Sequence, residues 1–338
     1  MRFVSLLFCS LTIFFLSCNN NDNVPHALKI ITHDSFDVKQ ELIDDFSKIN
    51  NIQVEIIKAG DANQILTRSI LNAGNPEGDL IFGIDNIAYK RIDNVSELLV
   101  PYVSEYRKQI PRKILNVFDD ALYFTPIDYG YVSINYDPKF NNQPPPQNLE
   151  ELLEPAWKDK FIVLDPATSS PGLQFLISTI AYFGQDTWLD FWQELKQNNV
   201  LITDSWTSGY YTHFSQNGGD RPLVVSYTTS PAAEAFFGGL EQPPTQNVIL
   251  DNLFRQVESV SILKGSKNID NAKKFIDFML TDNFQKQIPE TMFVYPVIQD
   301  LELPEWWSMN VEISEMQNFN FSDKELQVWI TEWSKVMR

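Results

Sequence analysis

Short β-type runs alternate with helical stretches over the first third of the chain. The β-type runs are 28–32, 53–58 and 80–84, and the stretches with helical spacing are 38–50 and 61–73. An order of strand, helix, strand, helix, strand predicts a parallel sheet in an α/β fold. In such sheets ligands bind at the carboxyl ends of the strands. The loops that follow the three strands, 33–35, 60–62 and 85–86, are therefore the first candidates for a binding site.

The composition is that of a packed globular protein with an excess of acid. The chain has 338 residues, of which 43% are hydrophobic and 21% are charged, which is room for two or three domains. It carries 26 basic and 44 acidic side chains, so its formal net charge is −18 at pH 7. Acidic proteins repel polyanions, which argues against nucleic acid as a partner. The excess acid supports solubility and favours cationic small molecules as ligands.

Both cysteines, Cys9 and Cys18, lie in the first eighteen residues. Residues 2–17 combine one basic residue with an apolar run too short to span a bilayer comfortably, which is typical of a secretion signal. The sequence Phe-Leu-Ser-Cys at 15–18, followed by a polar tether, resembles a bacterial lipoprotein processing site, so we expect a lipid on Cys18. A plain signal peptide or an uncleaved anchor is the alternative. The mature chain would then lack disulfides, thiolate metal sites and cysteine nucleophiles.

A second α/β region begins near residue 125. Its β-type runs are 131–136, 161–164 and 223–227, a proline-rich stretch at 144–146 marks a crossover, and 257–263 is predicted to be a return crossing. The loop 165–172 opens a long apolar helix, with Ser170 suited to the N-cap and Pro171 to the first turn. Free N–H groups at this helix start and the hydroxyls of Thr168, Ser169 and Ser170 are expected to face an anion such as a phosphate.

Seven short motifs carry a family likeness in the same order along the chain. The more specific ones are Ser-Tyr-Thr-Thr-Ser-Pro at 226–231 and Asp-Pro-Ala-Thr-Ser-Ser-Pro-Gly at 165–172. The others are 32–36, 79–86, 128–131, 295–297 and 329–333. Together they resemble the thiamine-binding periplasmic proteins of ABC importers, within the wider type II solute-binding protein fold. The likeness covers nearly the whole mature chain.

The resemblance implies two α/β lobes joined by a hinge that the chain crosses twice, closing on one ligand between them. We expect a lipoprotein signal peptide at 1–17 and a tether at 18–26. The first lobe would be discontinuous, with residues 27–125 and 260–338, and the second lobe would be 126–259.

The resemblance also implies a ligand site. Asp61 would contact the pyrimidine or its amine, Ser169 would hold the hydroxyl or phosphate end, and Trp206 and Tyr227 would be ring walls. The remaining candidates for ligand contact are Ser170, Thr228, His33, Asp85, Asn86 and Phe293. Aromatic faces and a carboxylate suit a permanent thiazolium cation. The set of aromatic residues around the ligand is smaller than in the family, because His33, Ala233 and Phe293 stand where other aromatic residues are expected.

Purely structural roles are the alternative for some of these residues. Asp61, Ser169 and Ser170 are also suited to be helix N-caps. The pair Trp329 and Trp333, four residues apart, is expected to pack as core on one helix face.

Two other functions remain in consideration. A receptor for ferric iron or another small cation could use Tyr210, Tyr211 and His33, although the tyrosine pair is not at the strand end where Tyr227 lies. A thiamine-modifying enzyme is less favoured, because the thiamine-degrading enzymes of this fold rely on a cleft cysteine that the mature chain would lack, and no other catalytic motif replaces it.

We therefore expect a monomeric receptor for thiamine or a thiamine phosphate, with no catalytic activity, no metal and no cofactor. It would deliver its ligand to an ABC permease driven by an ATPase. We expect it in the periplasm or on the outer face of the cytoplasmic membrane, anchored by the lipid on Cys18.

Overall fold

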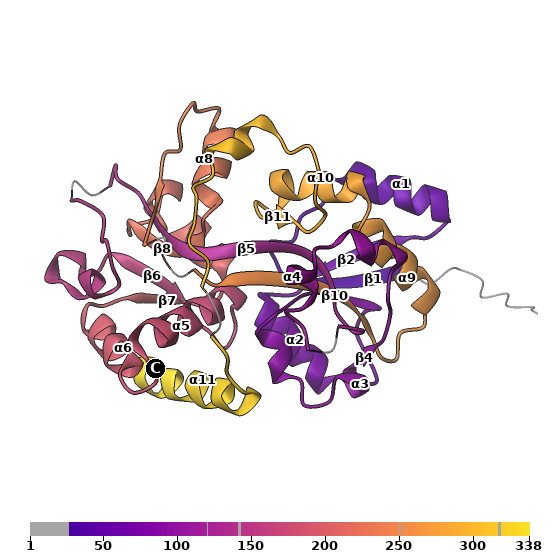
Figure 1. Cartoon of the computed structure of the whole chain (residues 1–338), viewed down its shortest axis with the longest axis horizontal. Helices are drawn as coiled ribbons and strands as arrows, with labels where there is room; N and C mark the ends of the chain where they lie inside the picture. The colour runs from indigo at the N-terminus through magenta and orange to yellow at the C-terminus, as the bar shows by residue number, and fades with distance from the viewer. Residues whose placement is uncertain (1–26, 120, 141–142, 250, 252, 317–318) are drawn as a thin grey trace, which may run out of the picture.

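The computed structural model describes residues 27–119, 121–140, 143–249, 251, 253–316 and 319–338, and shows two α/β lobes side by side (Figure 1). Each lobe has its own hydrophobic core. The predicted tether and Cys18 lie outside the described residues. No helix within the described ranges is both long enough and apolar enough to cross a membrane.

The first lobe contains the strand and helix alternation that the sequence predicts. Its elements are β1 (Leu28–Thr32), α1 (Gln40–Asn50), β2 (Val54–Lys58), α2 (Ala62–Leu71), β3 (Leu80–Asp85), α3 (Val95–Leu98), β4 (Leu99–Val100), α4 (Arg112–Leu115), α9 (Ile269–Met279), α10 (Asp282–Thr291) and β11 (Tyr295–Pro296). Strands β1, β2 and β3 pair in parallel, as expected. All six residues of β3 are buried, so this strand lies in the centre of the lobe.

The second lobe repeats this construction. Its elements are β6 (Phe161–Leu164), α5 (Ser170–Phe183), α6 (Trp188–Gln197), β7 (Leu201–Thr203), α7 (Trp206–Ser208), β8 (Leu223–Tyr227), α8 (Ser230–Gly238), β9 (Gln246–Val248) and α11 (Asp323–Met337). Strand β6 pairs in parallel with β7 and β8. A short 3₁₀ turn, Glu150–Leu153, precedes β6. Helix α5 begins one residue earlier than expected, so its N-cap is Ser169 rather than Ser170.

Two long antiparallel strands, β5 (Thr125–Tyr136) and β10 (Arg255–Leu263), join the lobes. The sheet order is β2-β1-β3-β10-β5-β8-β6-β7. The first half of β5 pairs with β10, and residues Val132–Tyr136 of β5 pair with β8 in the second lobe. Two α/β lobes joined by crossing strands are therefore present, as expected.

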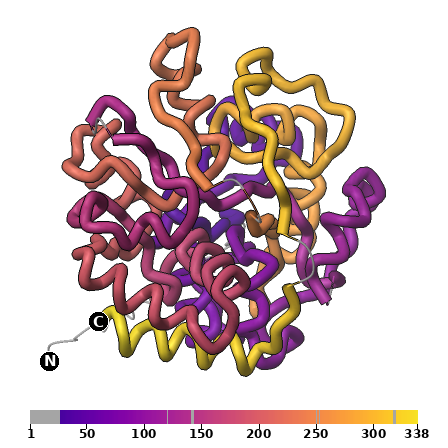
Figure 2. Tube along the Cα trace, turned by 60° about the vertical axis from the view of Figure 1, so that its left-hand side comes forward, coloured from indigo at the N-terminus to yellow at the C-terminus, as the bar shows by residue number. Residues whose placement is uncertain are grey.

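The end of the chain departs from the predicted lobe boundaries. Residues 260–338 were all expected in the first lobe, but α11 packs against α6 of the second lobe (Figure 2). Leu326, Trp329, Trp333 and Met337 form its buried face, which confirms that the two tryptophans pack as core. The chain therefore passes between the lobes a third time on its way to α11. The amphipathic pattern of α11 requires a buried face but does not specify which lobe covers it.

Candidate functional site

A cavity of about 260 Å³ lies between the two lobes. The first lobe contributes the loop after β1, the end of β2 and the end of α10 with the segment after it. The second lobe contributes α7, the π-helical segment Gly209–His213, the end of β8 and the start of α8. Its lining residues are His33, Asp34, Ser35, Asp37, Lys58, Trp206, Thr207, Tyr211, Tyr227, Ser230, Glu258, Thr291, Met292, Phe293 and Val294. Four of the predicted site residues are therefore brought together here: His33, Trp206, Tyr227 and Phe293.

Aromatic rings form the wall that the second lobe contributes. The rings of Trp206 and Tyr227 lie 6.3 Å apart at 59°, and Tyr211 stands edge-on to Trp206 at 5.4 Å. The indole N–H of Trp206 donates to Ser226 Oγ at 2.9 Å, which fixes the plane of the ring. A Cβ on Gly130 would lie 2.7 Å from Tyr227 Cδ1, so the glycine of the Asp-Tyr-Gly-Tyr motif makes room for this ring.

A second cavity of about 450 Å³ adjoins the first and shares Trp206, Tyr211, Ser230 and Phe293 with it. Tyr210 stacks on the other side of Trp206, at 4.8 Å and 17°. The carboxyl of Glu234 on α8 lines this cavity and accepts the hydroxyls of Tyr210 and Thr245. Burial raises the pKa of Glu234 to about 7.

Acidic side chains gather on the side of the first cavity that faces the hinge. Glu258 on β10 lines the cavity, and its Oε2 lies 3.4 Å from Nε2 of His33. Asp128, its neighbour across the strand pair, is buried behind it. Burial and the adjacent Glu258 raise the pKa of Asp128 well above its usual value.

His33 is buried between this acidic group and an aromatic cluster. Its Nδ1 is 2.8 Å from Ser35 Oγ, and its ring packs against Phe82 at 5.4 Å. A Cβ on Gly83 would lie only 2.8 Å from His33 Cδ2, so this glycine is needed beside the imidazole. Burial alone would lower the pKa of His33, but the charge and hydrogen bond of Glu258, together with the charges of Asp61 and Asp34, outweigh burial and raise the pKa above its usual value.

Asp61 does not line the cavity but lies directly behind it, at the contact between the lobes. It is the N-cap of α2 and forms a capping box with Gln64. Its carboxylate also accepts two backbone N–H groups of the second lobe, from Trp206 at 2.9 Å and from Ser170 at 3.3 Å. Burial raises the pKa of Asp61, and these hydrogen bonds reduce the rise.

Two of the predicted anion-binding residues at the start of α5, Ser169 and Ser170, are buried within the protein. The hydroxyl of Ser170 donates to Asp85 on β3, and Ser169 Oγ accepts the N–H of Gly172 at 3.4 Å. Gln256 links this group to the cavity wall, because its amide donates to Ser170 Oγ at 3.2 Å and accepts the Tyr227 hydroxyl at 3.1 Å. Burial raises the pKa of Asp85 to about 7.

The last two predicted residues take structural positions. The side chain of Asn86 pairs with the backbone of β10, donating to Arg255 at 3.0 Å and accepting from Val257 at 2.8 Å. Thr228 is buried, and its backbone pairs with Tyr131 and with Asn247. Neither side chain is among those that line the two interlobe cavities.

Sequence reasoning missed Glu258 and gave Tyr211 no part in the thiamine-type site. Glu258 carried a detectable signal, since it is the one carboxylate in the predicted return strand, residues 257–263. Tyr211 had none, because it reaches the cavity through a π-helical segment, Gly209–His213, whose turn is wider than the regular spacing.

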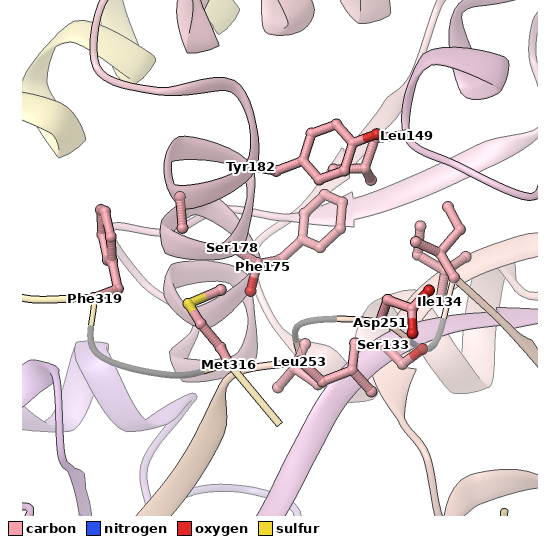
Figure 3. Close-up of a pocket in the computed structure, with 13 residues that line it drawn as sticks. Ser133, Ile134, Leu149, Phe175, Ser178, Tyr182, Asp251, Leu253, Met316 and Phe319 are labelled. Atoms are coloured by element: carbon pink, nitrogen blue, oxygen red, sulfur yellow. The ribbon is translucent and has the colours of Figure 1, made fainter. Parts of the chain in front are cut away.

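A third cavity, of about 320 Å³, lies in the second lobe away from the interface (Figure 3). Phe175, Ser178 and Tyr182 of α5 line one side, and Met316 and Phe319 line the other. The hydroxyls of Ser178 and Tyr182 already donate to Gln174 and Glu150. This cavity therefore offers few polar groups that could orient a ligand.

The described part of the chain contains no group of three histidine, cysteine or acidic side chains arranged to hold a metal. Ferric sites built on tyrosine need the ionised phenolate. Burial and the neighbouring Glu234 hold the pKa of Tyr210 well above its usual value, and burial with nearby acids does the same for Tyr227. These surroundings oppose a tyrosinate ligand.

Comparison with known proteins agrees with this architecture. A thiamine-binding periplasmic protein of Salmonella typhimurium is 29% identical over 289 residues, covering 85% of each chain, and one of Brucella suis is 30% identical over 277 residues, covering 80% of this chain and 79% of the relative. A solved periplasmic thiamin binding protein superposes with a TM-score of 0.80 at 26% identity, covering 94% of this chain and 98% of the other. Residues 79–323 match the family model for bacterial extracellular solute-binding proteins. The chain therefore belongs to the bacterial extracellular solute-binding protein family.

Proposed function

We propose that this protein is a receptor that captures thiamine between its two lobes and delivers it to an ABC import permease. The observation that carries the proposal is the interlobe cavity, in which aromatic rings and a carboxylate face one another. Thiamine combines two flat rings with a permanent positive charge. Aromatic faces and an acidic group in a site shielded from water are the groups that hold such a cation.

The positions of individual residues suggest how the ligand is held. Trp206, Tyr211 and Tyr227 would cover the rings of the ligand from the second lobe. Glu258 would balance the thiazolium charge from the hinge. Asp61 would contribute without touching the ligand, because its carboxylate accepts the backbone N–H of Trp206 and so holds this ring in place at the interface between the lobes.

The relatives support the same ligand. Those of Salmonella typhimurium and Brucella suis are named thiamine-binding periplasmic proteins, and the superposed structure is named a periplasmic thiamin binding protein. We propose that this chain, like them, works outside the cytoplasm. A lipid on Cys18 would hold it at the outer face of the cytoplasmic membrane as a monomer, and it would act without a cofactor and without catalysis.

A thermal-shift screen tests the ligand. The purified protein is heated alone and with thiamine, spermidine or ferric citrate. We expect thiamine to raise the melting temperature, because a ligand at about 100 times its Kd adds about 2.7 kcal/mol of stability. A shift with ferric citrate or spermidine, and none with thiamine, would contradict the proposal.

A further inference from the structure

We propose that this receptor selects unphosphorylated thiamine, because Asp61 and Asp85 of the first lobe occupy the helix start where a phosphate ester would bind. The inference rests on the proposed function. The start of a helix beside the cleft is the usual place for a phosphate in an α/β fold, since its N–H groups are free and its dipole is positive. In this protein α5 is such a helix, and two carboxylates of the protein itself already lie at its start.

Every backbone donor around the start of α5 is already in use. The N–H groups of the preceding loop, at Ala167, Thr168 and Ser169, all donate to Asp165. In the first turn, Ser170 donates to Asp61, Pro171 has no N–H, and Gly172 donates to Ser169 Oγ. An incoming phosphate would therefore find no free donor in this segment.

Two hydroxyl groups of the same segment, those of Thr168 and Ser170, are occupied as donors as well. Thr168 donates to the backbone carbonyl of Asp204 at 2.7 Å, and Ser170 donates to Asp85. A phosphate could gain the hydroxyl and the N–H of Ser170 only by displacing the buried carboxyl groups of Asp85 and Asp61. Asp61 and Asp85 would then lose their partners in a site shielded from water, which strongly opposes the exchange.

The charges that line the two interlobe cavities disfavour a phosphate elsewhere too. The first cavity has the acids Asp34, Asp37 and Glu258 against the bases Lys58 and His33. The start of α8 also reaches both cavities, through Ser230. An anion placed there would share the second cavity with Glu234, which stands one turn further along the same helix. Like charges brought together in this way oppose binding.

Isothermal titration calorimetry on the mature protein, purified after its processing in the cell, tests the inference. Thiamine, thiamine monophosphate and thiamine diphosphate are titrated separately. We expect thiamine to bind and both esters to bind about tenfold more weakly or worse. Equal or tighter binding of an ester overturns the inference but leaves the proposed function standing. Failure of all three ligands to bind overturns both.

Two variants test the cause. Asp85→Asn replaces the ionisable carboxyl group at α5 with a neutral amide while keeping an oxygen for the N–H groups of Ile87 and Ala88, and we expect it to narrow the difference in affinity between thiamine and its monophosphate. Asp79→Asn is the matched control, because Asp79 is a buried aspartate of the same lobe that lines neither cavity. We expect the control to keep the parent ratio. If Asp85→Asn and Asp61→Asn also keep that ratio, the carboxylates do not set the selection and the inference is wrong.

Discussion

The carboxylate of Asp61 in the first lobe accepts the backbone N–H of Trp206 in the second lobe at 2.9 Å. One side chain therefore caps helix α2 and also holds the ring wall of the cavity in place across the interface. Stability of the first lobe and closure around a ligand are linked through this residue.

Replacing Asp61, compared with a control that loses only a helix cap, separates the effect on stability from the effect on ligand binding. We expect Asp61→Ala to lower the free energy of unfolding by about 1–2 kcal/mol, as for the loss of an N-cap, and also to weaken thiamine binding. Chemical denaturation and titration measure the two effects. Ser322→Ala is the control, because Ser322 forms the same kind of capping box at α11. It should lose stability and keep its affinity; equal affinities for the two variants would argue against a role for Asp61 in closure.

Trp206 should report on the ligand directly. We expect Trp206→Phe to abolish most of the quenching of tryptophan fluorescence by thiamine while keeping a ring in the wall. Trp206→Ala should weaken binding by about 0.5–2 kcal/mol more than Trp206→Phe, because it also removes the face that attracts the cation. Trp188→Phe, a change in the core of the second lobe, should leave the quenching intact. If quenching persists without Trp206, the ligand lies elsewhere.

Binding should strengthen as the pH rises. The pKa of His33 is raised by Glu258, so at acidic pH the imidazole is charged, neutralises Glu258 and repels a cationic ligand. Deprotonation frees Glu258 for the ligand. We expect affinity to increase between about pH 5 and pH 8, and His33→Gln to flatten this dependence. His213→Gln, which lies outside the cavity, should keep the parent profile. A fall in affinity with rising pH would contradict the assignment.

The same ion pair has the opposite effect on stability. A histidine whose folded-state pKa lies above its unfolded value of about 6.5 stabilises the fold most below that value. This contribution is lost as the pH rises through the folded-state pKa. Melting of the ligand-free protein should therefore show His33→Gln losing more stability at pH 5 than at pH 8.

Asp85 is predicted to make the fold less stable at alkaline pH. Its folded-state pKa is raised to about 7, whereas an unfolded aspartate ionises near about 4, so stability declines as the pH rises between these values. Asp85→Asn lacks this decline. We expect the melting temperature of the variant relative to the parent to rise by about 2–4 °C from pH 5 to pH 8. An unchanged difference would show that Asp85 is not held protonated.

Much of the fold could be predicted, because it depends on local patterns. The alternation between residues 28 and 84 predicted three parallel strands with two helices, and all five are present. The partner of α11 could not be predicted, since the buried face of an amphipathic helix does not identify the surface that covers it. The third passage of the chain between the lobes was missed for the same reason.

The candidate site could be predicted only in part. The resemblance implied that Trp206 and Tyr227 are ring walls, and both side chains line the cavity. The roles of Asp85 and Ser170 could not be anticipated, because residues 85 positions apart meet only when the two lobes close. A hydroxyl in a loop looks available in sequence, and its partner across an interface is visible only in the folded chain.

Equilibrium titration of thiamine into the ligand-free protein tests the central claim most directly. We expect saturable binding of one thiamine per chain at micromolar or lower concentration, weakened in Glu258→Gln, which removes the charge facing the cavity. A folded protein that binds no thiamine, with a melting curve unchanged by it, would contradict the account.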